Sequence, residues 1–222
     1  MDLVIFDCDG VLVDSEPVVN RIESEYFGSL GFAIDPREAR RRFQGLTVDG
    51  VAAAVAAEIG RPLEPESLYA WGMATALALV ESLQPVAGVG AVVDALAAAG
   101  TPICVASQSP LPRVRLSLAV TGLAAAFGTH VFTASMVARP KPAPDLFLHA
   151  AQRMGTVPAN CVVIEDSPSG VLAARAAGMT VFGYAVEDGA GAAALEAAGA
   201  RPFRAMSELP GLLSAEGAQA AD

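Results

Sequence analysis

The sequence predicts an α/β fold, a doubly wound parallel sheet with a helical domain inserted after its first strand. Two observations support this prediction. Short apolar runs alternate with helix-like segments over most of the chain, and the runs are unbroken, as expected for parallel strands buried on both faces. Residues 15–85 differ, because they contain helix-like segments only. We therefore predict a core domain of residues 1–14 and 86–222 and an inserted helical domain of residues 15–85.

Apolar runs of strand length are followed by residue types that begin or end helices. Gly100 is placed to end one helix, and Asp145 and Ser167 or Ser169 are placed to begin two others. The predicted strands are Leu3–Phe6, Pro102–Ala106, Cys161–Ile164 and Thr180–Tyr184, with Val131–Phe132 as a shorter fifth candidate. The predicted core helices are Val89–Ala99, 145 to about 154, and one that follows Ser167 or Ser169 and ends at Ala177.

The inserted domain is predicted to be a small helical bundle, and residues 85–88 return the chain to the sheet. Its predicted helices are Glu16–Leu30, Pro36–Phe43, Val48–Ile59 and Pro65–Leu83. At the other end of the chain, Ser207-Glu208-Leu209 indicates a short terminal helix, and we expect the last eight residues to be frayed.

The composition and net charge argue against several classes of partner and of site. A formal net charge of −10 disfavours nucleic acid and anionic membrane surfaces, which both require a basic face. No apolar run approaches the roughly 18 residues that span a bilayer. Acidic residues interrupt the N-terminal apolar run, which argues against a signal peptide. The three cysteines form no CxxC pair, so we expect buried thiols rather than disulfides or a zinc site. We predict a soluble cytoplasmic protein, a monomer or weak homodimer.

Polar side chains follow three of the predicted strands at their carboxyl ends. Asp7 and Asp9 follow the first strand, Ser107 follows the second, and Glu165 and Asp166 follow the fourth. Ligands of parallel sheets bind at this edge, so we expect these residues to meet in one crevice. Several carboxylates in one crevice repel each other, and a hard divalent cation relieves that repulsion. Oxygen ligands and few carboxylates favour Mg²⁺.

Four segments resemble, in order, the signature motifs of the haloacid dehalogenase superfamily. The first is Asp7-Cys8-Asp9-Gly10-Val11-Leu12-Val13-Asp14-Ser15-Glu16. Ser107, Lys141 and the run Ile164-Glu165-Asp166-Ser167 resemble the other three. The inserted helices match the first cap type of this superfamily, in its β-phosphoglucomutase and phosphatase-like subfamily. The resemblance covers nearly the whole chain, with two departures: Pro140 precedes the lysine, and Gln108 follows Ser107.

The resemblance implies the chemistry of the first motif. Asp7 would attack phosphorus and form an aspartyl-phosphate, and Asp9 would protonate the leaving alkoxide and then activate water. Mg²⁺ would be held by the side chains of Asp7 and Asp166 and by the backbone carbonyl group of Asp9. Glu165 would lie at or near the metal, or it would serve only to set the turn.

The remaining motifs are implied to bind the phosphoryl group. Ser107 and the following amide, that of Gln108, would bind phosphoryl oxygens. Lys141 would neutralise charge on the nucleophile and the phosphoryl group. It is the only lysine of the chain, which indicates that a compact point charge is needed at this position.

A loop between two helices of the inserted domain resembles the substrate-specificity loop of the family. Gly45 would allow this loop to approach the pocket closely, and Gln44 would donate a hydrogen bond to a sugar hydroxyl. Arg40, Arg41 and Arg42 precede the loop. They are either a solvated basic helix end, favoured by the helix dipole, or Arg42 binds a carboxylate or second anion of the substrate.

Neighbouring activities of the superfamily can be compared with these residues. A halide leaves without a proton, so Asp9 favours phosphoryl transfer over dehalogenation. A phosphonoacetaldehyde hydrolase needs a lysine of the inserted domain for a Schiff base, and the absence of lysine from residues 15–85 argues strongly against that activity. A β-phosphoglucomutase stays open as an alternative, although its cap histidine and arginine correspond to about Val19 and to a position near Val48. A non-catalytic sugar-phosphate-binding protein is the alternative from another class.

The sequence therefore predicts a Mg²⁺-dependent phosphatase that acts on a small phosphorylated metabolite. Its loop and motifs resemble those of bacterial sugar-phosphate phosphatases, including the 6-phosphogluconate type. A sugar phosphate or a phosphorylated sugar acid is the substrate class that this resemblance implies.

Overall fold

A computed structural model describes residues 1–185 and 189–219, which form one six-stranded sheet with the order β3-β2-β1-β4-β5-β6. All neighbouring strands pair in parallel. The strands are β1 (Leu3–Phe6), β2 (Ile103–Ser107), β3 (Val131–Thr133), β4 (Cys161–Glu165), β5 (Thr180–Tyr184) and β6 (Arg201–Phe203). The chain adds strands first on one side of β1 and then on the other, so the strand order reverses between β1 and β4. This is the doubly wound topology that the sequence predicts.

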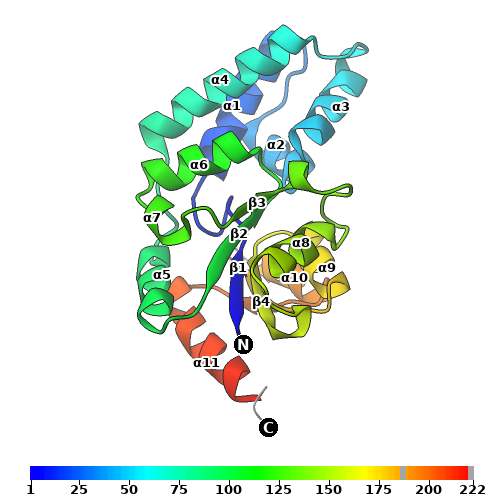
Figure 1. Cartoon of the computed structure of the whole chain (residues 1–222). Helices are drawn as coiled ribbons and strands as arrows, with labels where there is room; N and C mark the ends of the chain where they lie inside the picture. Colours follow the sequence, from blue (N-terminus) through cyan, green and yellow to red (C-terminus); the bar gives the residue numbers. More distant parts are fainter. Residues whose placement is uncertain (186–188, 220–222) are drawn as a thin grey trace.

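The sheet is covered by helices on both faces (Figure 1). Val4 and Phe6 of β1 point to the face covered by α5, α6, α7 and α11, whereas Leu3 and Ile5 point to α8, α9 and α10. These helices are α5 (Val89–Ala98), α6 (Leu111–Val120), α7 (Ala124–Phe127), α8 (Asp145–Arg153), α9 (Pro168–Ala176), α10 (Gly189–Ala197) and α11 (Leu209–Gln219). Short 3₁₀ helices span Ala134–Met136, Pro158–Asn160 and Met206–Glu208. The three cysteines are free and buried, as predicted.

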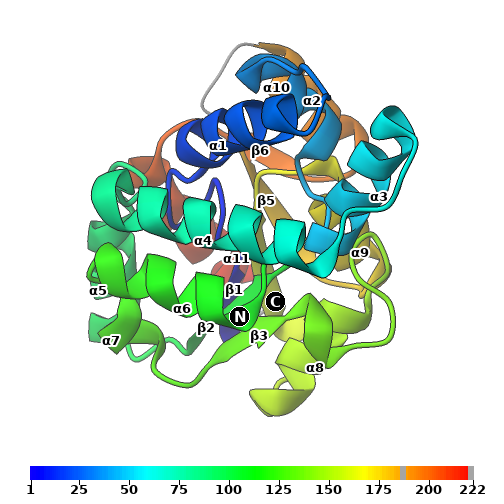
Figure 2. The same ribbon diagram turned by 90° about the horizontal axis from the view of Figure 1, so that it is seen from above.

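The inserted segment forms four helices at the carboxyl edge of the sheet, seen from above in Figure 2. They are α1 (Glu16–Ser29), α2 (Pro36–Phe43), α3 (Val48–Ile59) and α4 (Pro65–Ser82). Asp35 begins α2 by accepting hydrogen bonds from two backbone N–H groups, and Thr47 begins α3 by accepting one from the N–H of Gly50. Phe27 of α1 is fully buried between Phe43 and Trp71, so aromatic packing joins α1, α2 and α4.

Most predicted elements lie within one residue of the observed ones, and the differences have local causes. Strand β6 was not predicted, because Arg201 and Pro202 are exposed and only Phe203 is buried. A proline is tolerated in such an edge strand. Helix α6 was not predicted either, because it begins among prolines, which resemble a loop in sequence although the first helical turn accepts them.

The chain's C-terminal segment differs from the prediction. We expected the last eight residues to be frayed, but helix α11 continues to Gln219, and its buried residues Leu209 and Leu213 join the core. The frayed end expected at 220–222 lies outside the described residues. Within residues 1–185 and 189–219, no helix has both the length and the apolar character needed to cross a bilayer.

Candidate active site

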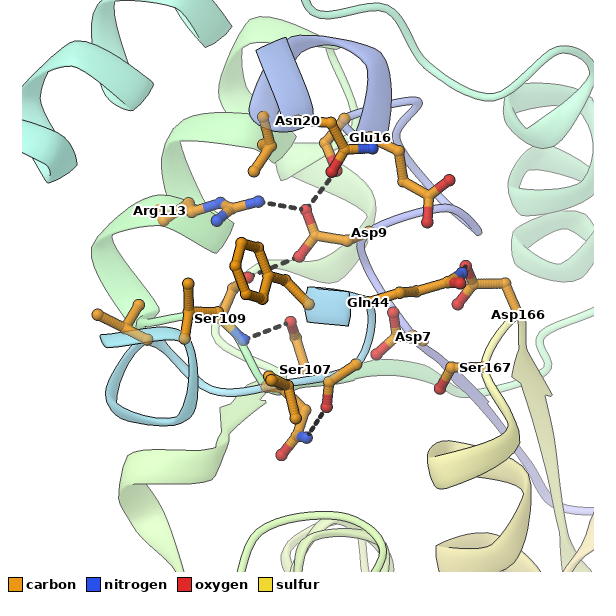
Figure 3. A pocket seen from close by; sticks show the side chains of 18 of the residues that line it. Asp7, Asp9, Glu16, Asn20, Gln44, Ser107, Ser109, Arg113, Asp166 and Ser167 are labelled. Carbon is orange, nitrogen blue, oxygen red and sulfur yellow. Dashed lines mark hydrogen bonds and ion pairs between the residues drawn. The ribbon is translucent and has the colours of Figure 1, made fainter. Parts of the chain in front are cut away.

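Asp7 and Asp166 lie at the carboxyl ends of the two adjacent strands where the strand order reverses. The backbone N–H of Asp7 donates to the Ile164 carbonyl at 2.9 Å, which continues the pairing of β1 and β4 beyond the last residue of β1. Both side chains line one cavity, and Figure 3 shows them on the same side of it. The reversal of strand order therefore brings together the first and fourth motifs, as the sequence predicts.

The ammonium group of Lys141 makes three short hydrogen bonds at the base of this cavity. Its Nζ atom lies 2.7 Å from Asp7 Oδ1, 2.7 Å from Glu165 Oε1 and 2.9 Å from the Ala106 carbonyl oxygen. Burial alone would lower the pKa of Lys141, but the charges of Asp7 and Glu165 outweigh it and raise the pKa above its ordinary value. Lys141 is therefore charged and fixed, with all three of its donors used.

Glu165 belongs to this cluster, but both of its oxygens are occupied by protein groups. Oε1 accepts from Lys141, and Oε2 accepts from the N–H groups of Asp166 and Ser167 and from the Ser167 hydroxyl at 2.8–2.9 Å. A side chain at Gly170 would collide with this carboxylate. The geometry favours the interpretation in which Glu165 sets the turn and orients Lys141, and it offers no support for a metal contact by Glu165.

Asp9 is held as a carboxylate by three donors (Figure 3). The hydroxyls of Ser15 and Ser109 lie 2.5 and 2.6 Å from its oxygens, and Arg113 Nη2 lies 3.0 Å from Oδ1. Burial would raise the pKa of Asp9, but the Arg113 charge and these hydrogen bonds together lower it below its ordinary value. Asp9 is therefore ionised in the free protein at neutral pH.

The other carboxylates of the site lack enough positive charge. Burial raises the pKa of Asp7 to about 7, and the charges of Glu165 and Asp9 add to this effect while Lys141 opposes it. Burial also raises the pKa of Asp166 well above its ordinary value, and the charges of Glu165, Asp7 and Glu16 contribute. Lys141 thus pairs with Asp7 and Glu165, and both of these carboxylates repel the carboxylate of Asp166. A bound divalent cation would remove this imbalance.

The oxygen ligands that are present suit Mg²⁺. In the parts of the chain that the structure describes, no group of three or more histidine, cysteine, aspartate or glutamate side chains is arranged to hold a metal ion. The predicted set needs only two carboxylates, those of Asp7 and Asp166, with the Asp9 carbonyl group and water. Mg²⁺ is commonly held by one or two carboxylates and retains several waters, so these residues fit the ion.

The second motif lies on the opposite side of Asp7 from the fourth (Figure 3). Ser107 is buried at the end of β2, and its hydroxyl accepts from the Ser109 N–H at 3.1 Å. The Gln108 side chain donates to the Gly45 carbonyl, and its Oε1 accepts from the Lys141 N–H at 3.1 Å. Gln108 therefore joins the second and third motifs to the loop that follows α2, and only its backbone amide remains for the predicted phosphate contact.

The loop after α2 contacts the core at two residues, and the predicted contact of Gln44 with a sugar hydroxyl stays a prediction. Gln44 Nε2 donates to Asp166 Oδ2 at 3.1 Å. Gly45 has a φ of +75°, and a Cβ atom there would lie 2.7 Å from the Ser169 hydroxyl oxygen. Gly45 is thus needed both for its left-handed backbone and for its close approach to α9.

Arg42 is placed away from this cavity. Its guanidinium pairs with Glu58 of α3 at 2.6 Å and lies 5.1 Å from the centre of the Phe32 ring. Arg42 is not among the residues that line the cavity. The structure therefore favours the interpretation of 40–42 as a basic helix end and gives no support to a substrate contact by Arg42.

The cavity is shared between the core and the inserted helices and has a volume of about 110 Å³. Its core side carries the four motifs, and its other side is formed by α1, α2, α3 and α4. The residues from the inserted helices and their loop include Val19, Asn20, Glu23, Phe43, Gln44, Gly45, Val48, Val51 and Trp71.

Comparison with known proteins identifies the family. The sequence pattern of the haloacid dehalogenase-like hydrolases matches residues 1–178. The chain belongs to this family. It is similar to the 6-phosphogluconate phosphatase of Escherichia coli K12, with 31% identity over 188 residues and 84% of each chain covered. It is also similar to hexitol phosphatase A of the same organism, with 35% identity over 186 residues and 80% of each chain covered.

A solved structure supports the same assignment. A haloacid dehalogenase family hydrolase of Deinococcus radiodurans R1, with bound phosphate and sodium, is 36% identical to this chain. The two structures superpose with a TM-score of 0.78 over 98% of this chain and 96% of that one. The chain is accordingly a hydrolase of phosphoric monoesters, with the Rossmann-like core of the haloacid dehalogenase family and a set of inserted helices.

Several residues that line the site of this haloacid dehalogenase-like hydrolase were not predicted. Ser109, in the loop after β2, and Arg113, in the first turn of α6, both bind Asp9, and the only signal in the sequence is their closeness to the second motif. Glu23 carries a further signal, because it falls on the buried stripe of α1 formed by Val19, Ile22 and Phe27. A carboxylate at a core-facing position indicates a buried polar site.

Proposed function

We propose that the chain is a Mg²⁺-dependent phosphatase that hydrolyses a small sugar phosphate or phosphorylated sugar acid through a phosphorylated Asp7. The observation that supports this most strongly is the position of Asp7. It lies in the cavity between the core and the inserted helices, with Lys141 bound to one of its oxygens and Asp9 two residues away. A nucleophile, a cation and an acid–base group are thus gathered where a phosphoryl group would bind.

The first step would transfer the phosphoryl group to Asp7. Lys141 holds Oδ1, so Oδ2 would attack phosphorus while the bond from phosphorus to the ester oxygen breaks. Asp9 would give its proton to that oxygen, which leaves as an alcohol. Asp9 is ionised in the free protein, so the proton must be gained on binding. A negatively charged phosphoryl group beside Asp9 raises its pKa and favours this.

The second step would release phosphate. Asp9 would take a proton from water, the oxygen of this water would bond to phosphorus, and the bond to Asp7 would break. Mg²⁺ held by Asp7, Asp166 and the Asp9 carbonyl group would neutralise charge on the phosphoryl oxygens in both steps. Ser107 and the backbone amide of Gln108 would donate to the same oxygens.

We also propose that residues 15–85 form a cap domain that closes over residues 1–14 and 86–222. Gln44 and Gly45 reach the fourth motif, and Gln108 binds the loop from the other side. Closure of this kind would keep bulk water from the phosphorylated Asp7 until the alcohol has left. A cytoplasmic location and a monomeric or weakly dimeric state stay predictions.

Apolar residues in the cap favour a phosphatase over a mutase. Val19 and Val48 line the cavity, near the positions where a β-phosphoglucomutase has its cap histidine and arginine. Without those polar groups the cap is poorly suited to hold a bisphosphate while it reorients. The sequence signals for a mutase, the shared core motifs and the Glu165-Asp166 pair, do not separate the two activities.

A screen of phosphorylated metabolites for phosphate release, with and without Mg²⁺, tests this function. We expect Mg²⁺-dependent release from sugar phosphates, abolished in Asp7→Asn. Conversion of β-glucose 1-phosphate to glucose 6-phosphate without phosphate release would support the mutase instead. Sugar-phosphate binding without any turnover would support a non-catalytic binding protein.

A further inference from the structure

Three side chains with buried polar atoms line the cavity, each from a different helix. Glu23 lies on α1, Trp71 on α4 and Arg113 on α6, and all three line the cavity that contains Asp7. Helix α4 packs against both α1 and α6, so the three residues meet where the inserted helices cover the core. The mechanism proposed above uses only the Nη2 atom of Arg113, which binds Asp9.

One polar atom of each of these side chains is buried and has no hydrogen-bond partner among the described residues. Glu23 is 4% exposed and Trp71 is 5% exposed. Glu23 Oε2, Trp71 Nε1 and Arg113 Nε are all without a partner among the described residues. The charge of Arg113 lowers the pKa of Glu23 against the larger effect of burial, but the ion pair of Arg113 is with Asp9 and not with Glu23. Buried polar groups are nearly always hydrogen-bonded in folded proteins, so the unpaired atoms of Glu23, Trp71 and Arg113 indicate a site for a polar ligand.

The proposed chemistry directs the leaving group toward this cluster. Asp9 must reach the ester oxygen that leaves, and in Figure 3 Asp9 lies between Asp7 and Arg113. The phosphoryl group would be on the Asp7 side of Asp9. The organic part of the substrate therefore extends toward Arg113, Glu23 and Trp71.

We infer that Glu23 and Trp71 form a subsite for hydroxyl groups of the leaving alcohol, and that Glu23 disfavours leaving groups that carry a carboxylate. This inference rests on the proposed phosphatase function. When Glu23 is ionised, its Oε2 atom accepts hydrogen bonds but cannot donate one, whereas Trp71 Nε1 donates but cannot accept. A hydroxyl group can do both, so neighbouring hydroxyls of a polyol or sugar satisfy the two residues together. A carboxylate would accept from Trp71 but would be repelled by Glu23.

Steady-state kinetics of the full chain with Mg²⁺ at pH 8, above the pKa of about 7 to which burial raises Glu23, test this subsite. The probes are a hexitol 6-phosphate, 6-phosphogluconate and p-nitrophenyl phosphate, whose leaving group has no hydroxyl beyond the ester oxygen. The variants are Glu23→Gln, which removes the charge, and Trp71→Phe, which removes Nε1 and retains the aromatic packing on Phe27. Glu81→Gln on the exposed face of α4 is the control, and we expect it to leave all three activities unchanged.

We expect the wild-type enzyme to prefer the hexitol phosphate to 6-phosphogluconate. In Glu23→Gln and Trp71→Phe, kcat/KM for the hexitol phosphate should fall about tenfold more than kcat/KM for p-nitrophenyl phosphate. Glu23→Gln should also reduce the ratio of kcat/KM for the hexitol phosphate to kcat/KM for 6-phosphogluconate. A wild-type preference for 6-phosphogluconate, or equal losses on the hexitol and nitrophenyl substrates, would overturn the inference.

A binding measurement separates failure of the subsite from failure of the proposed function. Trp71 is the only tryptophan of the chain, so its fluorescence reports directly on this subsite. We expect a saturable fluorescence change with the hexitol phosphate, and an apparent Kd about tenfold higher in Glu23→Gln. If the wild type hydrolyses none of the three esters, the proposed function fails, and this titration still decides the subsite. A hexitol phosphate that causes no saturable change rejects it.

Discussion

Lys141 Nζ lies 2.7 Å from Asp7 Oδ1, and the same nitrogen binds Glu165 and a backbone carbonyl. A planar guanidinium cannot place three donors around one nitrogen, so arginine should not replace this lysine. We predict that Lys141→Arg lowers kcat by about 100-fold or more, measured as phosphate release with Mg²⁺. Arg139→Lys is the matched control, because Arg139 is an exposed neighbour paired with Asp145. Activity of Lys141→Arg close to that of the wild type would show that the three contacts are dispensable.

We predict that Asp166 destabilises the metal-free protein and is needed to bind the metal ion. Its raised pKa reflects burial and repulsion by Glu165 and Asp7, so Asp166→Asn should raise the Tm measured in EDTA. The same change should weaken Mg²⁺ binding and phosphatase activity. In the wild type, Mg²⁺ at about 100 times its Kd should stabilise the fold by about 2.7 kcal/mol. A wild-type Tm that is identical in Mg²⁺ and EDTA would count against a metal site here.

Glu23 predicts a pH dependence of stability. Burial raises its pKa from 4.5 to about 7, opposed by Arg113, so the folded protein holds this proton more tightly than the unfolded chain does. The contribution of Glu23 to stability is therefore greatest below pH 4.5 and is lost as the pH rises to about 7. The loss corresponds to about 3 kcal/mol.

Glu23→Gln removes this loss. Urea unfolding should find the variant more stable than the wild type at pH 8, with a difference that shrinks toward pH 5. Glu81→Gln, at an exposed position of α4, should follow the wild type at both pH values. If the difference between Glu23→Gln and the wild type is the same at pH 5 and pH 8, the pKa of Glu23 is not raised.

Gly45 should be needed for closure rather than for folding. A Cβ atom there would lie 2.7 Å from the Ser169 hydroxyl oxygen, so Gly45→Ala should hold the loop away from the core and reduce kcat/KM by about tenfold. Gly60→Ala is a matched control, because Gly60 has a similar φ of +71° but open space around it. Both variants should lose similar stability in thermal unfolding. Equal kcat/KM in the two would mean that the close approach of Gly45 has no functional importance.

The core of the site could be predicted from sequence because parallel strands impose a common geometry. Asp7 and Asp166 each follow a strand and Ser107 is the last residue of one, and the carboxyl ends of such strands meet at one edge of the sheet. Lys141 was predicted by its motif and by its being the single lysine, although it follows no strand directly. The third contact of its nitrogen, with the Ala106 carbonyl, was not foreseen.

The cap side of the site was not predictable in the same way. Glu23 and Trp71 come from helices whose contact depends on packing across the whole inserted segment. Arg42 illustrates the same limit, because its neighbours in sequence reveal a basic cluster but not its partner Glu58 on another helix. Arg113 was missed for a local reason, since the prolines before and within the first turn of α6 resemble a loop.

The phosphorylation of Asp7 is the central claim, and trapping it is the most direct test. Asp9→Asn cannot activate water, but p-nitrophenolate leaves without needing a proton, so the first step should proceed and the second should stall. We predict a burst of about one p-nitrophenolate per enzyme, and after acid quenching, a peptide containing Asp7 that is heavier by one phosphoryl group. Turnover of p-nitrophenyl phosphate by the wild type, with no burst in Asp9→Asn and no phosphoryl group on that peptide, would contradict the account.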